Sequence, residues 1–279
     1  MKKDEMTSGN HTFTILLYHG VDAGEKFYEQ RSNKEREYII TKAQFNNHLE
    51  LFKRLGMQTP PLEQCLRQIQ NNKFASRTLI LSFDDGEESG YTTIAPLLEK
   101  YGFRGSYFIV AGWINKPGYM TEDQIRQLHK RGHGIYSHSM THPFFTRISE
   151  AEIMSELRES KECLEKILGQ EVKCFSLPTG EYDERFKELI AHSGYSYICT
   201  SREGYNRVMQ KRQYPFLLHR FAIRNYTKLR DLKFIINARK ITNLLLALKA
   251  ITFFILKNII GKDRYERIRS GIINNFYKD

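Results

Sequence analysis

Short apolar runs alternate with amphipathic stretches along most of the chain. Seven runs have the length and composition of β-strands, over residues 14–18, 78–83, 105–110, 134–138, 172–177, 195–200 and 217–223. Apolar residues recur at helical spacing over 41–52, 62–69, 91–101, 121–131, 149–168 and 183–192, whereas the charged stretch 28–37 predicts a loop. Strands that alternate with helices predict a parallel sheet with crossover connections. The sequence therefore predicts an α/β fold of the barrel type, not a sandwich or a helix bundle.

Charge divides the chain into two parts. Residues 1–200 carry 25 Lys/Arg against 27 Asp/Glu, whereas residues 201–279 carry 18 against 5. A basic end on a near-neutral body predicts an anionic partner there, such as lipid, nucleic acid or a phosphorylated sugar carrier. The composition changes after Lys240, and the residues beyond it do not have the pattern of another strand–helix unit. We therefore expect a catalytic domain over 1–239 and a basic, apolar helical tail over 240–279.

The tail contains a segment suited to a membrane surface. Fourteen of the 21 residues in 241–261 are Ala, Ile, Leu or Phe, and none is acidic. Lys249 near the middle of the segment disfavours a spanning helix, so we expect a helix that lies on an anionic membrane. The alternative is a helix that packs on the barrel or on a partner subunit.

Two further features bear on the compartment. The four cysteines show no CxxC spacing, and the first apolar run is too short for the core of a signal peptide. We expect a cytoplasmic protein, peripheral on the inner face of the cell membrane.

Two polar clusters follow predicted strands, at the edge where α/β folds place their active sites. Asp84 and Asp85 lie in the run Leu81–Gly86 at the end of a predicted strand, and His138 and His142 lie four residues apart at the end of the strand 134–138. One carboxylate and two imidazoles make a ligand set for Zn²⁺ or a similar divalent ion, which would leave the second carboxylate as a base. The alternatives are an ordinary Asp-Gly turn and two unrelated histidines.

A third cluster, Cys174–Gly180, follows the strand 172–177. Pro178 and Gly180 make a rigid loop, whose backbone N–H groups could face a developing oxyanion. An ordinary turn would explain the same residues.

The order FDDG, HSMTH and FSLPTG resembles the polysaccharide deacetylases of carbohydrate esterase family 4, which share a NodB-like homology domain. The opening LLYHGV is similar to their first strand, and the resemblance covers roughly residues 13–224. It implies a distorted, incomplete (β/α) barrel. It also implies one divalent metal ion, with zinc as the expected ion, held by Asp85, His138 and His142.

The resemblance further implies that Asp84 is the general base and that the Thr179 N–H stabilises the oxyanion, between Pro178 and Gly180. The sequence departs from the family pattern in two places. Ser176 stands where the third motif commonly carries an arginine that orients the base, and no Asp-Trp pair follows.

The general acid is open between two histidines. His219 lies in a Leu-His pair that is similar to the family's last motif, although the stretch 215–225 also resembles a branch without that histidine. His19, which ends the first strand, is the rival residue lining the site.

Together these features predict hydrolysis of an N-acetyl or similar N-acyl group from an amino sugar of a polysaccharide, a glycolipid or a precursor. One alternative is a weakly active or inactive module on the same fold that binds carbohydrate or a lipid carrier. A second is a nucleic-acid-binding protein, suggested by the basic tail. No nucleic-acid fold signature supports it, so no nucleic-acid partner is expected.

Overall fold

The computed structural model describes residues 11–24, 28, 31–71, 73, 75, 77–208 and 216–237. The chain divides into two compact units, residues 1–225 and 226–279. The strands of the first unit are β1 His11–Tyr18, β2 Val21–Asp22, β3 Ile40–Thr41, β4 Leu79–Phe83, β5 Ser106–Ile109, β6 Gly134–Ser137, β7 Cys174–Ser176, β8 Tyr197–Cys199, β9 Asn206–Val208, β10 Phe216–Leu218 and β11 Phe221–Ala222. Its α-helices are α1 Asn33–Arg36, α2 Lys42–Arg54, α3 Leu62–Gln70, α4 Ala95–Lys100, α5 Glu122–Lys130, α6 Glu150–Leu168 and α7 Glu184–Ala191.

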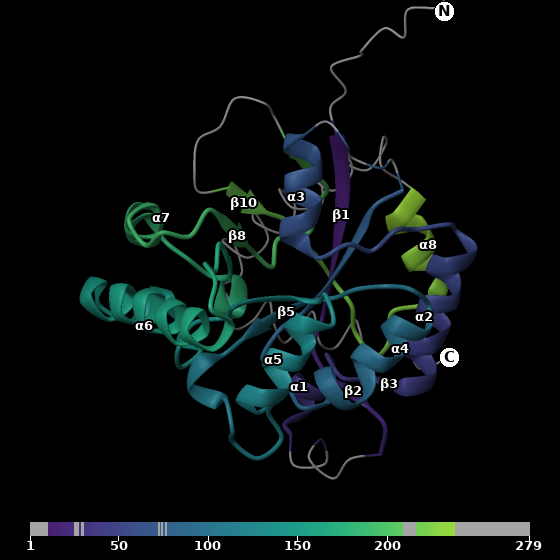
Figure 1. Ribbon diagram of the computed structural model, residues 1–279, viewed down its shortest axis with the longest axis horizontal. Coiled ribbons are helices and arrows are strands. Elements are labelled where there is room, and N and C mark those ends of the chain that lie inside the picture. The colour runs from purple at the N-terminus through teal and green to yellow at the C-terminus, as the bar shows by residue number, and fades with distance from the viewer. Residues whose placement is uncertain are drawn as a thin grey trace, which may run out of the picture. The chain divides into compact units, whose positions relative to one another are not determined.

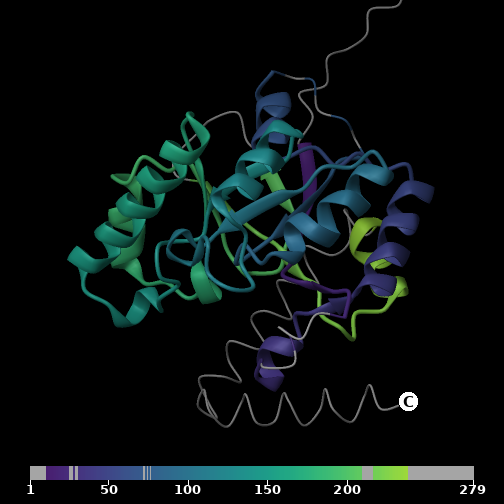
Figure 2. The same ribbon diagram turned by 60° about the horizontal axis from the view of Figure 1, so that its bottom comes forward.

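The main sheet is a curled, parallel one. Its strand order is β10-β8-β7-β6-β5-β4-β1-β11, and β9 pairs antiparallel with β1 at one end of the strand. Helices surround its outer side, where α5 and α6 pack against β6 and α7 packs against α6 (Figures 1 and 2). The predicted distorted, incomplete (β/α) barrel is confirmed.

The two edges of this sheet are formed by one short stretch of chain. The sequence predicted a single strand over 217–223, but the structure has two strands with a break at His219 and Arg220. β10 pairs with β8 at one edge, and β11 pairs with β1 at the other. The break lets the chain pass from one edge of the sheet to the other, and the barrel stays incomplete because β10 and β11 end the strand order at opposite edges.

Capping explains where the helices begin. Thr41, Thr121 and Ser149 form capping boxes at the starts of α2, α5 and α6, where the predicted helical ranges begin. The prediction of a loop over 28–37 was incomplete, because Asn33–Arg36 forms one helical turn. Ser32 caps that turn with Glu35, a local pattern that the high charge of the stretch had masked.

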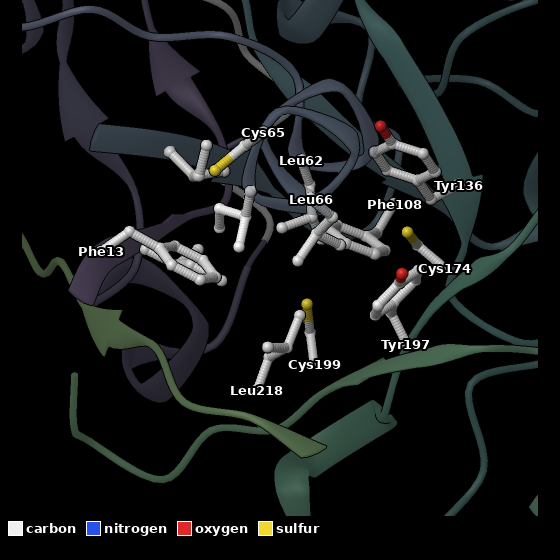
Figure 3. Close-up of a cluster of buried hydrophobic side chains, with 13 residues drawn as sticks. Phe13, Leu62, Cys65, Leu66, Phe108, Tyr136, Cys174, Tyr197, Cys199 and Leu218 are labelled. Carbon is white, nitrogen blue, oxygen red and sulfur yellow. The ribbon is translucent and has the colours of Figure 1, made fainter. Parts of the chain in front are cut away.

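Helix α3 closes the barrel at the amino ends of the strands. Its apolar residues pack on inward-facing side chains of the barrel strands, as Figure 3 shows. The cluster consists of Phe13, Ile15, Leu62, Cys65, Leu66, Ile69, Ile80, Phe108, Tyr136, Cys174, Tyr197, Cys199 and Leu218. Because side chains alternate along a strand, every second residue beyond this core also points into the barrel, toward its carboxyl end.

The second unit contains helix α8, Leu229–Asn237. The predicted domain boundary at 239/240 and the tail segment 241–261 lie outside the described residues. Within the described ranges, no helix is both long enough and apolar enough to cross a membrane.

Candidate active site and metal centre

The two adjacent aspartates directly follow β4, the strand between β1 and β5. Asp84 is in phase with the inward residues Ile80 and Ser82, and its N–H donates to the Tyr18 carbonyl (3.0 Å). The chain then turns sharply, since Asp85 has a φ of 75° and Gly86 a φ of 79°. The turn gives the two carboxylates different surroundings, although they are neighbours in sequence.

Asp84 is held by an arginine that the sequence patterns did not reveal. Arg220 donates to both carboxylate oxygens of Asp84, at 2.7 and 2.8 Å, and is 0% exposed. Ser176 donates to Asp84 Oδ2 (2.9 Å), and Arg220 also donates to Ser176 Oγ (2.8 Å) and to the Thr200 carbonyl (3.0 Å). The arginine missing from position 176 is thus replaced by one from the break between β10 and β11. Arg220 is in phase with Leu218, which points into the core, and this alternation could have revealed it.

These contacts decide the charge of Asp84. Burial by itself would raise the pKa of this carboxyl, but the Arg220 guanidinium, and after it His138, hold the pKa well below its usual range. Asp84 is therefore an anion with a fixed orientation.

Asp85 faces the two histidines. One ligand atom from each of Asp85, His138 and His142 lies within 4.8 Å of the others. Asp85 Oδ1 is 3.5 Å from His138 Nε2 and 3.7 Å from His142 Nε2, and it has no hydrogen-bond partner among the described residues. A buried carboxylate oxygen that lacks a donor and faces two imidazole nitrogens fits a divalent cation.

The protonation of His138 agrees with a metal site. Its Nδ1 is 2.8 Å from the Ser176 carbonyl, which can only accept, so Nδ1 carries the proton and Nε2 presents a lone pair. Burial lowers the pKa of His138 to about 4. The ring is therefore neutral near pH 7, as a metal ligand must be.

The loop that carries the histidines is held by a second residue that the sequence did not single out. The Glu156 carboxylate, on α6, accepts from the N–H groups of Met140 (2.7 Å) and Thr141 (2.9 Å) and from Thr141 Oγ1 (2.6 Å). His142 has a φ of 63°, a conformation that is costly for this residue type. Glu156 stabilises the loop in that conformation.

The Pro178–Gly180 turn follows β7 directly after Leu177. Thr179 has a φ of 59°, and Gly180 has a φ of 72°. A Cβ at Gly180 would lie 2.5 Å from Ser201 Cβ, so only glycine allows the two loops to pack. The structure thus places the predicted oxyanion loop beside Ser176 and so beside Asp84.

The two candidate acids lie in different surroundings. His19 lies an even number of residues after the core residue Ile15, so its side chain is on the same side of the chain. Its ring centroid is 4.8 Å from that of Tyr38. Burial lowers the pKa of His19, while Asp85 and Asp84 both raise it. Its Nδ1 has no hydrogen-bond partner in the described part of the chain.

The side chain of His219 points to the opposite side of the chain from that of Arg220. Its ring lies against Gly204, and its backbone is bonded to the Asn206 side chain. Burial lowers the pKa of His219, and the largest charge effect on it comes from Arg202, not from the aspartates. The structure does not bring His219 to the Asp/His cluster.

Comparisons with known proteins point to the family that the sequence motifs resemble. A sequence profile described as polysaccharide deacetylase matches residues 71–198. YxkH of Bacillus subtilis, which its name assigns to the polysaccharide deacetylases, is 26% identical over 210 residues, 75% of this chain and 70% of YxkH. The poly-β-1,6-N-acetyl-D-glucosamine N-deacetylase of Staphylococcus aureus (strain N315) is 22% identical over 185 residues, which cover 61% of this chain and only 64% of that enzyme.

The fold is similar to that of the Streptococcus pyogenes deacetylase PplD, solved in complex with acetate. The TM-score is 0.72 at 22% identity, over 82% of this chain and 100% of PplD.

Proposed function

Because the chain belongs to the polysaccharide deacetylase family, we propose that it hydrolyses the N-acetyl, or a similar N-acyl, group of an amino sugar in a polysaccharide, a glycolipid or a precursor of either. The observation that carries this proposal is the division of labour between adjacent carboxylates. Arg220 holds Asp84 as an anion, whereas Asp85 faces His138 and His142 with an unpartnered oxygen.

Asp85, His138 and His142 would hold one divalent ion. Two imidazoles and one carboxylate favour zinc among the common ions. When bound, the ion would polarise the acyl carbonyl and lower the pKa of water beside it.

Asp84 would act as the general base. Its Oδ2 lies 3.7 Å from His138 Nε2, so the base sits beside the metal ligands. Arg220 is a positioning residue, since it fixes both carboxylate oxygens of Asp84 and is itself fully buried. The Thr179 N–H, in the turn formed with Pro178 and Gly180, would stabilise the oxyanion of the tetrahedral intermediate.

We assign the role of general acid, which protonates the leaving amine, to His19 and not to His219. The ring of His19 lies at the carboxyl end of β1, where the two aspartates influence its pKa. The ring of His219 lies against Gly204, out of phase with Arg220.

Mass spectrometry of a sugar substrate tests the proposal. The metal-loaded protein should remove acetyl groups from an oligomer of β-1,6-linked N-acetylglucosamine, the repeat in the name of the staphylococcal relative. A chelator or the Asp84→Asn substitution should abolish the reaction. If the oligomer binds but keeps every acetyl group, the protein is the alternative, a carbohydrate-binding module on this fold.

We also propose that residues 241–261 hold the enzyme on the anionic, cytoplasmic face of the membrane. Support comes from the sequence, where Lys249 and Lys257 interrupt an apolar segment without acidic residues. The full chain should sediment with phosphatidylglycerol vesicles at low salt, but not with phosphatidylcholine vesicles. Replacing both lysines with Glu should weaken binding by more than about tenfold, since each lysine near such a surface contributes ~1 kcal/mol. Equal binding to both vesicle types would contradict this proposal.

A further inference from the structure

The loop between β5 and α5 joins the two loops that carry the site. At its start, the Ala111 N–H donates to the Ser139 carbonyl (3.0 Å), and the Gly112 N–H donates to the Met140 carbonyl (2.9 Å). At its end, the Met120 N–H donates to the Gly86 carbonyl (3.0 Å). The loop is therefore fixed to the aspartate turn on one side and to the histidine loop on the other.

Close packing at Gly112 holds this arrangement. A Cβ there would lie 2.5 Å from the Met140 carbonyl oxygen, so the loops could not approach each other with any other residue. The side chains of the β5–α5 loop are therefore held in a fixed position relative to the proposed metal ligands.

The loop carries two aromatic rings beside the site. The Trp113 ring is 5.4 Å from the His142 ring and inclined to it by 31°. Tyr119 also packs against Trp113, with ring centroids 4.9 Å apart. Both residues are partly exposed.

A partly exposed indole next to a proposed metal ligand has two explanations. Its role could be limited to packing against the imidazole of His142, in which case its exposed part would have no function. It could also contact the substrate, because an acetamido group bound at Asp85 and the histidines brings its sugar ring within reach of the loop. Pyranose rings present C–H groups on their faces, and such surfaces pack well on a rigid aromatic ring with a polar edge.

We propose that Trp113, supported by Tyr119, is the platform on which the pyranose ring of the substrate stacks. This inference rests on the proposed deacetylase function, and it makes Trp113 a substrate-positioning residue. The platform selects amino sugars over acetyl compounds that lack a pyranose ring.

Two substrates separate positioning from support of the metal site. Trp113→Ala should raise the KM for a β-1,6-linked N-acetylglucosamine oligomer by about tenfold, the size of effect typical for a stacked aromatic contact. It should leave kcat/KM for p-nitrophenyl acetate and the bound metal within about twofold of the unsubstituted protein. Trp113→Phe should restore most of the affinity. Tyr101→Ala, a matched aromatic change near the amino end of β5, should leave the kinetic constants for both substrates unchanged.

A binding measurement gives a readout without turnover. Trp113 is the only tryptophan of the chain, so intrinsic fluorescence reports on this ring alone. In the metal-loaded Asp84→Asn protein, the oligomer should shift or quench the emission in a saturable way, whereas sodium acetate should not.

Two outcomes would overturn the inference. Equal losses on both substrates together with lost metal would mean that Trp113 only supports His142. An unchanged oligomer KM, or an emission that ignores the oligomer, would mean that the sugar does not touch it. Failure of the proposed function looks different, because the unsubstituted protein would then release no acetate from the oligomer at all.

Discussion

Replacement of Arg220 by Met tests how the base is held. The substitution keeps much of the side-chain volume, but it removes four hydrogen bonds, of which two reach Asp84, one reaches Ser176 and one reaches Thr200. Breaking a buried ion pair from one side costs ~3–5 kcal/mol, because the remaining charge stays buried. For a domain of this size we expect the melting temperature to fall by roughly 10 °C, with the chain still folded at room temperature.

The effect on catalysis depends on the pKa of Asp84. Without the guanidinium, burial is the main influence left, and it raises the pKa of the carboxyl. A buried carboxyl that has lost its cationic partner has a raised pKa, so the Asp84 pKa should move upward in the Arg220→Met protein. A base must be ionised, so activity lost near pH 6 should partly return near pH 9.

The assay is release of amine from the acetylated oligomer between about pH 5 and 9, with bound metal measured on the same samples. Arg220→Met should lower kcat/KM by ~10²–10⁴-fold at low pH and shift the acidic limb upward, with metal retained. The pair Arg220→Ser with Ser176→Arg moves the guanidinium to the other strand and should recover part of the rate. An unshifted pH profile with a rate within about twofold would refute the role given to Arg220.

Four further substitutions probe other parts of the molecule. His48, whose pKa burial lowers to about 4, stays neutral in the fold but protonates near 6.5 when unfolded, so it stabilises the fold above pH 6.5 by up to ~3 kcal/mol and loses this on acidification toward pH 4. His48→Gln should reduce the dependence of the unfolding free energy on pH in this window, as measured by urea titration. Glu156→Gln should weaken metal binding by ~10-fold or more in a chelator competition, since the loop loses charge-assisted hydrogen bonds. His19→Gln should lower kcat by ~10²-fold, whereas His219→Gln should stay within about threefold, and the reverse order would restore the assignment to His219.

Most of the fold could be predicted from the sequence, because apolar periodicity and capping residues act locally. The carboxyl ends of parallel strands share one edge, and this alone predicted that Asp84, Asp85, His138 and His142 lie together. The stretch 217–223 has the pattern of one strand, because both halves are apolar. Its division into two edge strands depends on how far the sheet curls, which no local pattern records.

The roles of Arg220 and Glu156 depend on contacts between distant segments. Ser176 looked like the loss of a positioning group, but a small residue there leaves room for a side chain from another strand. The sequence pattern alone favours His219 over Arg220 as a site residue, because histidine is the more common proton donor. Alternation from Leu218 points the arginine inward and the histidine away, so the two-residue period could have decided between them.

Crystals of the zinc-loaded full chain, with diffraction recorded on both sides of the zinc absorption edge, test the central claim most directly. If metal ligand and base are separate residues, a single anomalous peak should lie within bonding distance of Asp85 Oδ1, His138 Nε2 and His142 Nε2, with both Asp84 oxygens still bonded to Arg220. A peak that includes Asp84 as a ligand, or no peak among these side chains, would contradict that separation.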